Sequence, residues 1–181
     1  MEKIFVPKWY HLIWYPDWFR RIHQKPDRFL SELVREGMAA ADIGCGLGFY
    51  TVEMAKLVGE KGHVLAVDFQ PEMLKLAERK TRKAGMAERV RFIQCRQDDL
   101  VFSEAVDFVL TMYVAHEVSD RGRFFRQIRE ALKPGGRYLL AEPKYHVKKA
   151  RFLRIVGDAE SAGFKKVGEP VIASSRTAML V

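Results

Sequence analysis

The chain has 181 residues, of which 48% are hydrophobic and 30% are charged. This length fits one domain, and this balance supplies both a core and a polar surface, which excludes intrinsic disorder as a description of the chain. No apolar run reaches the roughly 20 residues that a membrane-spanning helix needs, and the first residues lack the apolar block of a signal peptide. We therefore expect a cytoplasmic protein with no membrane partner.

The formal net charge of +8 would suit nucleic acid, an anionic membrane surface or an acidic substrate equally well. The basic residues are scattered along stretches with helical periodicity, such as residues 78–83 and 121–129, which favours solvated helix faces over a nucleic-acid footprint. Cys45 and Cys95 have no metal-ligand spacing around them, so we expect two free thiols and no metal. Nucleic acid stays open as a partner but is not favoured.

Residues 11–21 (HLIWYPDWFRR) are unusually aromatic, and Pro16 interrupts any helix there. We predict that residues 1–26 form a short helical cap. Its aromatic side chains could close over a ligand or pack against the helices of the domain, and the second use is the more common one. These side chains are Trp9, Tyr10, Trp14, Tyr15, Trp18 and Phe19.

The next helix should begin at Pro26 and Asp27 and end at Gly37, with apolar residues on one face. From Met38 onward, short apolar runs alternate with amphipathic helices. The runs are residues 39–43, 63–67, 90–95, 106–111 and 137–141, and the helices are residues 50–58, 71–84 and 121–132. Such alternation predicts a mostly parallel sheet with helices on both faces.

The end of the chain departs from this alternation. Residues 147–162 have helical periodicity, and two extended runs follow at residues 164–172 and 177–181. The segment between these runs, residues 173–176, is too short for a helical crossover, so the two runs should pair antiparallel. The sequence therefore predicts an α/β fold for residues 27–181: a Rossmann-like, doubly wound, seven-stranded sheet that ends in an antiparallel hairpin.

The sharpest motif is DIGCGLG, residues 42–48, between the first predicted strand and the first helix. Glycines at 44, 46 and 48 allow backbone conformations that other residues avoid, and the following helix presents unpaired N–H groups to a ligand. The dinucleotide fingerprint G-x-G-x-x-G fails here because Phe49 stands at the third glycine. Asp42 before the turn also suits a ligand that carries an ammonium group better than a pyrophosphate.

Asp68 ends the second run in HVLAVDFQPEML, about 20 residues beyond the glycines. A carboxylate at this place can accept both hydroxyls of a ribose, and Phe69 could lie against adenine. The alternative is an aspartate that only caps the helix starting at Pro71.

His116 and Glu117 follow the fourth run, and Glu142 and His146 follow the fifth, so all four fall at the carboxyl edge of the predicted sheet. Histidine titrates near neutral pH, which makes His116 a candidate proton acceptor in catalysis. The alternative, slightly favoured because many methyl transfers need no base, is a histidine that only hydrogen-bonds a neighbouring loop. The KPGG sequence, residues 133–136, predicts a turn with no chemistry of its own.

These motifs resemble the class I S-adenosylmethionine-dependent methyltransferases, in particular the small group around UbiE and the type 11 domains. DIGCGLGFYTVEMAKLVGEKGHVLAVDFQPEML resembles the first two family motifs, VDFVLTMYVAHEV the fourth-strand motif, and ALKPGGRYLLAEP the following turn and strand. The resemblance covers residues 37–181. It implies a methyltransferase with S-adenosylmethionine as cofactor and a small-molecule acceptor that the sequence does not identify.

By this resemblance the glycine turn holds the methionine part of the cofactor, while Asp68 holds the ribose and Phe69 contacts the adenine. The family places an acidic residue near the adenine amino group where this chain has Arg96, so that contact would fall to Gln97 or Asp98. The full set of expected cofactor residues is Asp42, Gly44, Cys45, Gly46, Gly48, Asp68, Phe69, Gln97, Asp98 and Met112.

Two other functions remain open at this point. A module that binds S-adenosylmethionine or its demethylated product without catalysis would carry the same fold. An RNA methyltransferase would suit the basic balance, but the sequence has AHEV where such enzymes carry an Asn-Pro-Pro-Tyr-like motif.

Overall fold

The computed structural model describes residues 17–96 and 98–181, without the side chain of Phe19. Within these residues seven strands form one sheet in the order β3-β2-β1-β4-β5-β7-β6. The strands are β1 Ala39–Ile43, β2 His63–Asp68, β3 Val90–Gln94, β4 Val106–Met112, β5 Leu132–Pro143, β6 Lys166–Gly168 and β7 Ser175–Leu180. The helices are α2 Asp17–Gln24, α3 Pro26–Ser31, α4 Phe49–Val58, α5 Pro71–Lys83, η1 Ala87–Arg89, η2 Ala115–Glu117, α6 Arg121–Ala131 and α7 Lys149–Ser161.

Strands β1 to β5 are mutually parallel, and β1 lies at the centre of this group. Ala41 of β1, for example, pairs with Leu65 of β2 on one side and with Val109 of β4 on the other. Strand β7 runs antiparallel to both β5 and β6. This arrangement confirms the predicted Rossmann-like fold, and it brings the carboxyl ends of five strands and the start of β7 to one edge of the sheet.

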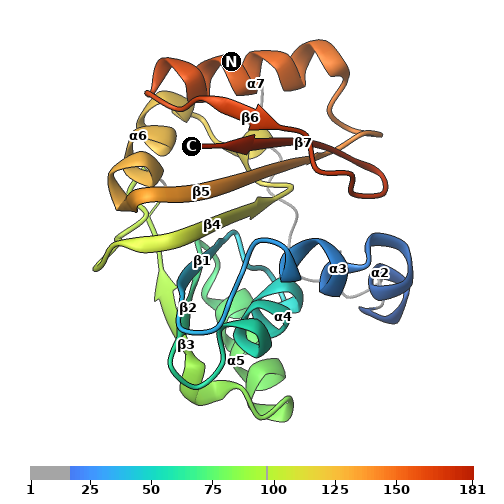
Figure 1. The fold of residues 1–181 in the computed structure, drawn as a ribbon, viewed down its shortest axis with the longest axis vertical. Helices are drawn as coiled ribbons and strands as arrows, with labels where there is room; N and C mark the ends of the chain where they lie inside the picture. Colours follow the sequence, from blue (N-terminus) through green and yellow to red (C-terminus); the bar gives the residue numbers. More distant parts are fainter. Residues whose placement is uncertain (1–16, 97) are drawn as a thin grey trace.

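Helices cover both faces of the sheet, as Figure 1 shows with α6 and α7 above and α4 and α5 below. Ala40 of β1 joins the apolar cluster under α3, α4 and α5, whereas Ala41 and Ile43 join the cluster under α6 and α7. A parallel strand that is buried on both faces has a continuous apolar sequence, and this is why apolar runs predicted β1 to β5.

Three elements differ from the sequence-based prediction. Helix α3 ends at Ser31, well before Gly37, and the chain continues in a turn in which the Val34 N–H donates to the Leu30 carbonyl. The KPGG residues 133–136 lie inside β5 as a bulge, because Val106 pairs with Leu132 while Phe108 already pairs with Arg137. The extended run 164–172 forms a strand only over β6.

The part of the predicted cap that the structure describes, residues 17–26, lies beside α4 and α5 (Figure 1). Arg21 of α2 forms an ion pair of 2.5 Å with Glu53 of α4, and Lys80 of α5 forms one of 2.6 Å with Asp17. Trp18 is 63% exposed, so the packing interpretation does not hold for it. Trp9, Tyr10, Trp14 and Tyr15 lie outside the described residues.

None of the helices in the described ranges combines the length and the apolar character needed to cross a bilayer.

Candidate functional site

The turn between β1 and α4 contains the three glycines that the sequence singled out. Gly44, Gly46 and Gly48 have φ angles of 70°, 53° and 76°, in the left-handed region that other residues adopt only at a cost. The N–H groups of Gly44 and Cys45 both donate to the carbonyl of Val67. The turn is therefore fastened to the end of β2.

The three glycines have different surroundings. A Cβ atom at Gly44 would lie 2.3 Å from Cγ2 of Val114, and one at Gly48 would lie 2.8 Å from Cβ of Ala77. A Cβ atom at Gly46 would meet no heavy atom within 4 Å. Gly44 and Gly48 are thus required by close packing, whereas Gly46 borders open space that a ligand can use.

Asp68 lies directly beside this turn. Its carboxylate accepts hydrogen bonds from the N–H groups of Gly46, at 2.8 Å, and Gln70, at 2.9 Å. Burial raises the pKa of Asp68, and the two backbone donors partly oppose this rise. Asp68 is not the cap of α5, because the N-cap residue is Gln70, whose backbone N–H the Asp68 carboxylate accepts. Each carboxylate oxygen has two lone pairs, so acceptor capacity remains for ribose hydroxyls.

Phe69 follows Asp68 and is 52% exposed at the same edge. An exposed aromatic ring next to a carboxylate that could bind a ribose is well placed to stack on an adenine base. Met112 is buried at the end of β4, and Cys45 is buried in the turn, where burial raises its thiol pKa. Both cysteines are free.

The carboxyl group of Asp42 is turned inward. Its side chain is 1% exposed and accepts a hydrogen bond of 2.6 Å from the hydroxyl of Thr51 in α4. Burial raises the pKa of Asp42 to about 7, and the charge of Asp68 adds to the rise. The hydrogen bond between Asp42 and Thr51 therefore links β1 to α4.

The residues predicted to contact the adenine do not form a compact group as the glycine turn does. Asp98 is exposed, and its carboxylate lies 3.7 Å from a guanidinium nitrogen of Arg123 in α6. Its backbone carbonyl accepts a hydrogen bond of 3.0 Å from Gln127 of the same helix. Arg96 is exposed and pairs through its backbone with Asp99. Gln97 lies outside the described residues.

His116 sits in η2, just after β4, and is held by Glu142 at the end of β5. The fully buried Glu142 carboxylate contacts Nδ1 of the imidazole and also accepts the backbone N–H of His116 at 3.2 Å. Arg151 of α7 donates to the His116 carbonyl at 3.0 Å, and the ring of His146 lies 5.1 Å away. The His116 side chain is 7% exposed, and its Nε2 lies 3.7 Å from Glu117.

Burial raises the pKa of Glu117 to about 7. The neighbouring His116 opposes this rise, whereas the charges of Glu142 and Asp68 add to it. Both the His116 cluster and the glycine turn follow carboxyl ends of parallel strands, so they lie along the same edge of the sheet.

A hydrogen-bonded chain that no sequence motif indicated ties the cap to the same edge. The hydroxyl of Tyr50 donates to Oε1 of Gln24, and Nε2 of Gln24 donates to the hydroxyl of Tyr113 at 2.8 Å. That hydroxyl also lies 2.8 Å from Oγ of Ser175 at the start of β7. Tyr113 has a φ of 68°, so a strained residue carries the central link.

The reversed β7, the glycine turn after β1 and the carboxylate at the end of β2 together define an α/β protein built to bind a nucleoside-containing cofactor. Residues 35–167 match a family model described as a methyltransferase domain. The chain belongs to this family, the class I S-adenosylmethionine-dependent methyltransferases.

Individual relatives agree with this assignment. The ubiquinone/menaquinone biosynthesis C-methyltransferase UbiE of Vibrio vulnificus is 32% identical over 124 residues, which are 67% of this chain and 48% of the relative. The chain therefore spans about half the length of the curated relatives it matches. The crystal structure of a SAM-dependent methyltransferase from Aquifex aeolicus is 25% identical with a TM-score of 0.84, covering 97% of this chain and all of the other. Fibrillarin of Aeropyrum pernix, solved with natively bound S-adenosyl-L-methionine, is 16% identical with a TM-score of 0.69, covering 91% of this chain and 76% of the other, and supports the fold alone.

Proposed function

We propose that this chain transfers a methyl group from S-adenosylmethionine to a small-molecule acceptor. The observation that carries the proposal is the hydrogen bond between Gly46 and Asp68. It joins a glycine turn that borders open space to a carboxylate that could bind a ribose, at the ends of neighbouring strands. The similarity to UbiE, a ubiquinone/menaquinone biosynthesis C-methyltransferase, supports a small molecule as acceptor. A cytoplasmic location and a domain boundary near residue 26 stay predictions from the sequence.

The described residues fit the cofactor. Open space at Gly46 admits the methionine part, and the positive end of the α4 dipole lies beside it. Asp68 would accept the ribose hydroxyls and Phe69 would cover the adenine. The remaining proposed cofactor residues are Asp42, Gly44, Cys45, Gly48, Asp98 and Met112, with Gln97 outside the described residues.

When bound, S-adenosylmethionine supplies an electrophilic methyl group. The protein's own contribution is to align the acceptor and exclude water, which is worth roughly 7 to 11 kcal/mol when the reacting groups are well oriented. His116 would take up the proton that the acceptor loses, at Nε2. Glu142 acts as a positioning residue, because it engages Nδ1 and stabilises the imidazolium that forms.

Calorimetric titration with S-adenosylmethionine and with NAD tests the cofactor, and we expect binding of the first only. A screen of thiols, phenols, amines and arsenite with methyl-labelled cofactor then tests catalysis. Asp68→Ala should weaken cofactor binding by about 1.5 to 3 kcal/mol, as expected for a charged hydrogen-bonding group. Tight cofactor binding without any labelled product would point instead to a non-catalytic binding module, and tight NAD binding would overturn the assignment of the cofactor.

His116→Ala should lower turnover while cofactor affinity is retained, because His116 is proposed to act on the acceptor. Glu142→Gln should shift the pH profile of turnover, since it removes the charge that holds the imidazole. An unchanged rate in His116→Ala would show that this histidine only links β4 to β5 and α7.

A further inference from the structure

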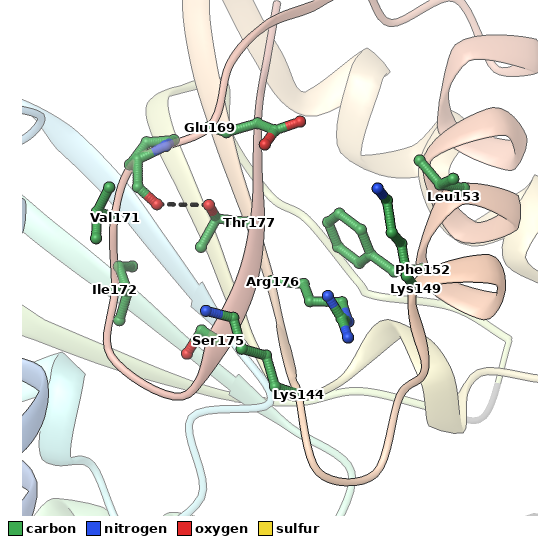
Figure 2. A pocket seen from close by; sticks show the side chains of 11 residues that line it. Lys144, Lys149, Phe152, Leu153, Glu169, Val171, Ile172, Ser175, Arg176 and Thr177 are labelled. Carbon is green, nitrogen blue, oxygen red and sulfur yellow. Dashed lines mark hydrogen bonds between the residues drawn. The ribbon is translucent and has the colours of Figure 1, made fainter.

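A hollow of about 210 Å³ lies beyond β5, away from the glycine turn. Figure 2 shows it between the start of α7 and the segment 169–172, with the start of β7 behind. The hydroxyl of Thr177 in β7 donates to the carbonyl of Pro170, which fastens the segment to the sheet. The hollow therefore has walls from three elements.

Three cationic side chains line the hollow, each from a different part of the chain. Lys144 follows β5, Lys149 begins α7, and Arg176 is the second residue of β7 (Figure 2). Nε of Arg176 donates to the carbonyl of Val147 at 3.0 Å, which fixes the guanidinium while its other N–H groups can serve a ligand. The carboxylate at the rim, Glu169, is bonded to Lys166, which lowers its pKa, and the charge of Lys149 adds a smaller effect in the same direction.

Apolar side chains complete the lining. Phe152 of α7 and Ile172 are buried in the walls, and Val171 at the rim is 97% exposed. A ligand that fills this hollow therefore meets both positive charge and apolar surface. This combination favours an anionic group attached to a hydrophobic body over a free inorganic ion.

The hollow adjoins the candidate acceptor site. Ser175 in its lining is hydrogen-bonded to Tyr113, which directly follows β4. Arg176 is the register partner of Glu142, the residue that holds His116. Directly paired residues of antiparallel strands place their side chains on the same face about 4.5 to 5.5 Å apart at Cβ. One strand spacing thus separates Arg176 in the lining from Glu142, and Glu142 in turn contacts His116.

We propose that this hollow binds the anionic end of the methyl acceptor, a carboxylate or phosphate carried on an apolar group. The inference rests on the proposed methyltransferase function and specifies its substrate class. A volume of about 210 Å³ is below the roughly 300 to 1,000 Å³ of sites that enclose a whole drug-sized ligand, so the hollow receives one end of the acceptor.

Binding of benzoate, phenyl phosphate and neutral benzamide to the protein loaded with S-adenosylmethionine tests the proposal by calorimetry or NMR. We expect both anions to bind, and the tighter of the two identifies the acidic group. Benzamide should bind at least about tenfold more weakly, and Lys144→Gln and Lys149→Gln should each weaken the anions by about three- to tenfold. Lys148→Gln is the matched control: it removes the same charge from the exposed residue beside Lys149, which does not line the hollow, and should change little.

An equal loss of anion binding in Lys148→Gln would show that only the overall positive field acts, and equal binding of benzamide would show that charge does not matter. Either result overturns the proposal. So would binding of a short RNA or of anionic lipid vesicles that depends on Lys144 and Lys149 when phenyl phosphate does not bind. Cofactor binding is measured separately: its absence overturns the methyltransferase function, whereas its presence without anion binding overturns this inference alone.

Discussion

Gly46 is the residue of the glycine turn at which ligand binding and packing can be separated. Its neighbours Gly44 and Gly48 would both bring a Cβ atom into collision with Val114 or Ala77, so substitutions there disturb the fold itself. At Gly46 a methyl group would instead enter the open space beside the carboxylate of Asp68. A change at this position therefore reports on the cofactor.

We expect Gly46→Ala to lower the affinity for S-adenosylmethionine at least about tenfold, while the left-handed φ of 53° costs about 1 to 2 kcal/mol of stability. Calorimetric titration and denaturant unfolding measure the two effects. Gly37→Ala is the matched control, because Gly37 has a φ of 82° and open space but precedes β1, far along the strand from the turn. Unchanged cofactor affinity in Gly46→Ala would show that the turn does not contact the ligand.

The buried carboxyl group of Asp42 gives stability a defined pH dependence. Burial raises its pKa from 3.8 to about 7 in the folded protein. The folded state therefore binds this proton more tightly than the unfolded chain, and the resulting stability is present below about pH 4 and lost as the pH rises through about 7. Glu117, whose pKa rises from 4.5 to about 7, contributes with the same sign.

Asp42→Asn should accordingly reduce the decline in the free energy of unfolding between pH 4 and pH 7, where one such group accounts for up to about 1.4 kcal/mol per pH unit. Urea unfolding at a series of pH values measures this slope. Glu160→Gln removes a carboxylate from the exposed end of α7 and controls for the change in net charge. A slope in Asp42→Asn equal to that of the parent protein would contradict the assigned protonation.

At the scale of elements, the last residue of α2 connects the cap to the sheet. Gln24 is 8% exposed and bridges Tyr50 of α4 to Tyr113 after β4. Truncation of Gln24 would leave the buried hydroxyl of Tyr50 and the part-buried hydroxyl of Tyr113 with fewer partners, and a buried hydroxyl costs about 1 to 3 kcal/mol when unsatisfied. The cap is thus held by a specific contact as well as by its ion pairs.

We therefore expect Gln24→Ala to lower the free energy of unfolding by about 1 to 3 kcal/mol and to increase proteolysis within the cap. A double-mutant cycle with Tyr113→Phe should show coupling of at least about 0.5 kcal/mol. His23→Ala is the neighbouring control, since the hydrogen bond between His23 and Ser174 is exposed and its loss should cost about 0.5 kcal/mol or less. Additive effects of Gln24→Ala and Tyr113→Phe would show that the bridge carries no energy.

The sequence predicted the elements whose burial leaves a regular pattern. The parallel strands appear as apolar runs because helices cover both faces, and β2 differs from its prediction only by including Asp68. Helix α3 was predicted too long because Leu33 and Val34 are buried in a turn that continues its apolar face. The KPGG bulge was predicted as a turn because local signals do not report that Leu132 already pairs with Val106.

The residues of the candidate site likewise fall into those that a local sequence pattern predicts and those that it does not. The glycine turn is one continuous motif, and Asp68 falls beside it because parallel neighbouring strands end at one edge, so both could be predicted. Gln24 and Tyr113 are 89 residues apart, and the Ser174 that pairs with His23 is 151 residues from it. Lys144 and Lys149 of the hollow likewise lie near Arg176 only because β7 pairs with β5 in the folded sheet. Such contacts depend on tertiary placement and leave no local pattern.

At the scale of the whole molecule, part of the positive charge behind the net value of +8 is paired with carboxylates in the described residues. Several basic side chains of the described residues form ion pairs with carboxylates of other elements or of the same helix. These pairs include Arg21–Glu53, Lys80–Asp17, Arg82–Glu78, Arg91–Glu104, Arg121–Asp158 and Lys133–Asp107. A phosphate backbone needs a row of available cations, and these ion pairs reduce the number of cations that RNA could engage, which is consistent with a small anionic acceptor.

A 20-nucleotide single-stranded RNA should therefore bind only in the non-specific range, with a dissociation constant of about 10⁻⁴ to 10⁻⁶ M at physiological salt, and should be lost as salt rises. Fluorescence anisotropy between 50 and about 200 mM salt measures this dependence, because each released counterion steepens the slope. Methyl-labelled cofactor incubated with total RNA should yield no labelled nucleic acid, whereas phenyl phosphate binding should persist in the same buffer because the hollow concentrates three cations on one anionic group. Binding of RNA well below the non-specific range, together with label transfer to RNA, would reverse the choice of acceptor class while leaving the cofactor site as described.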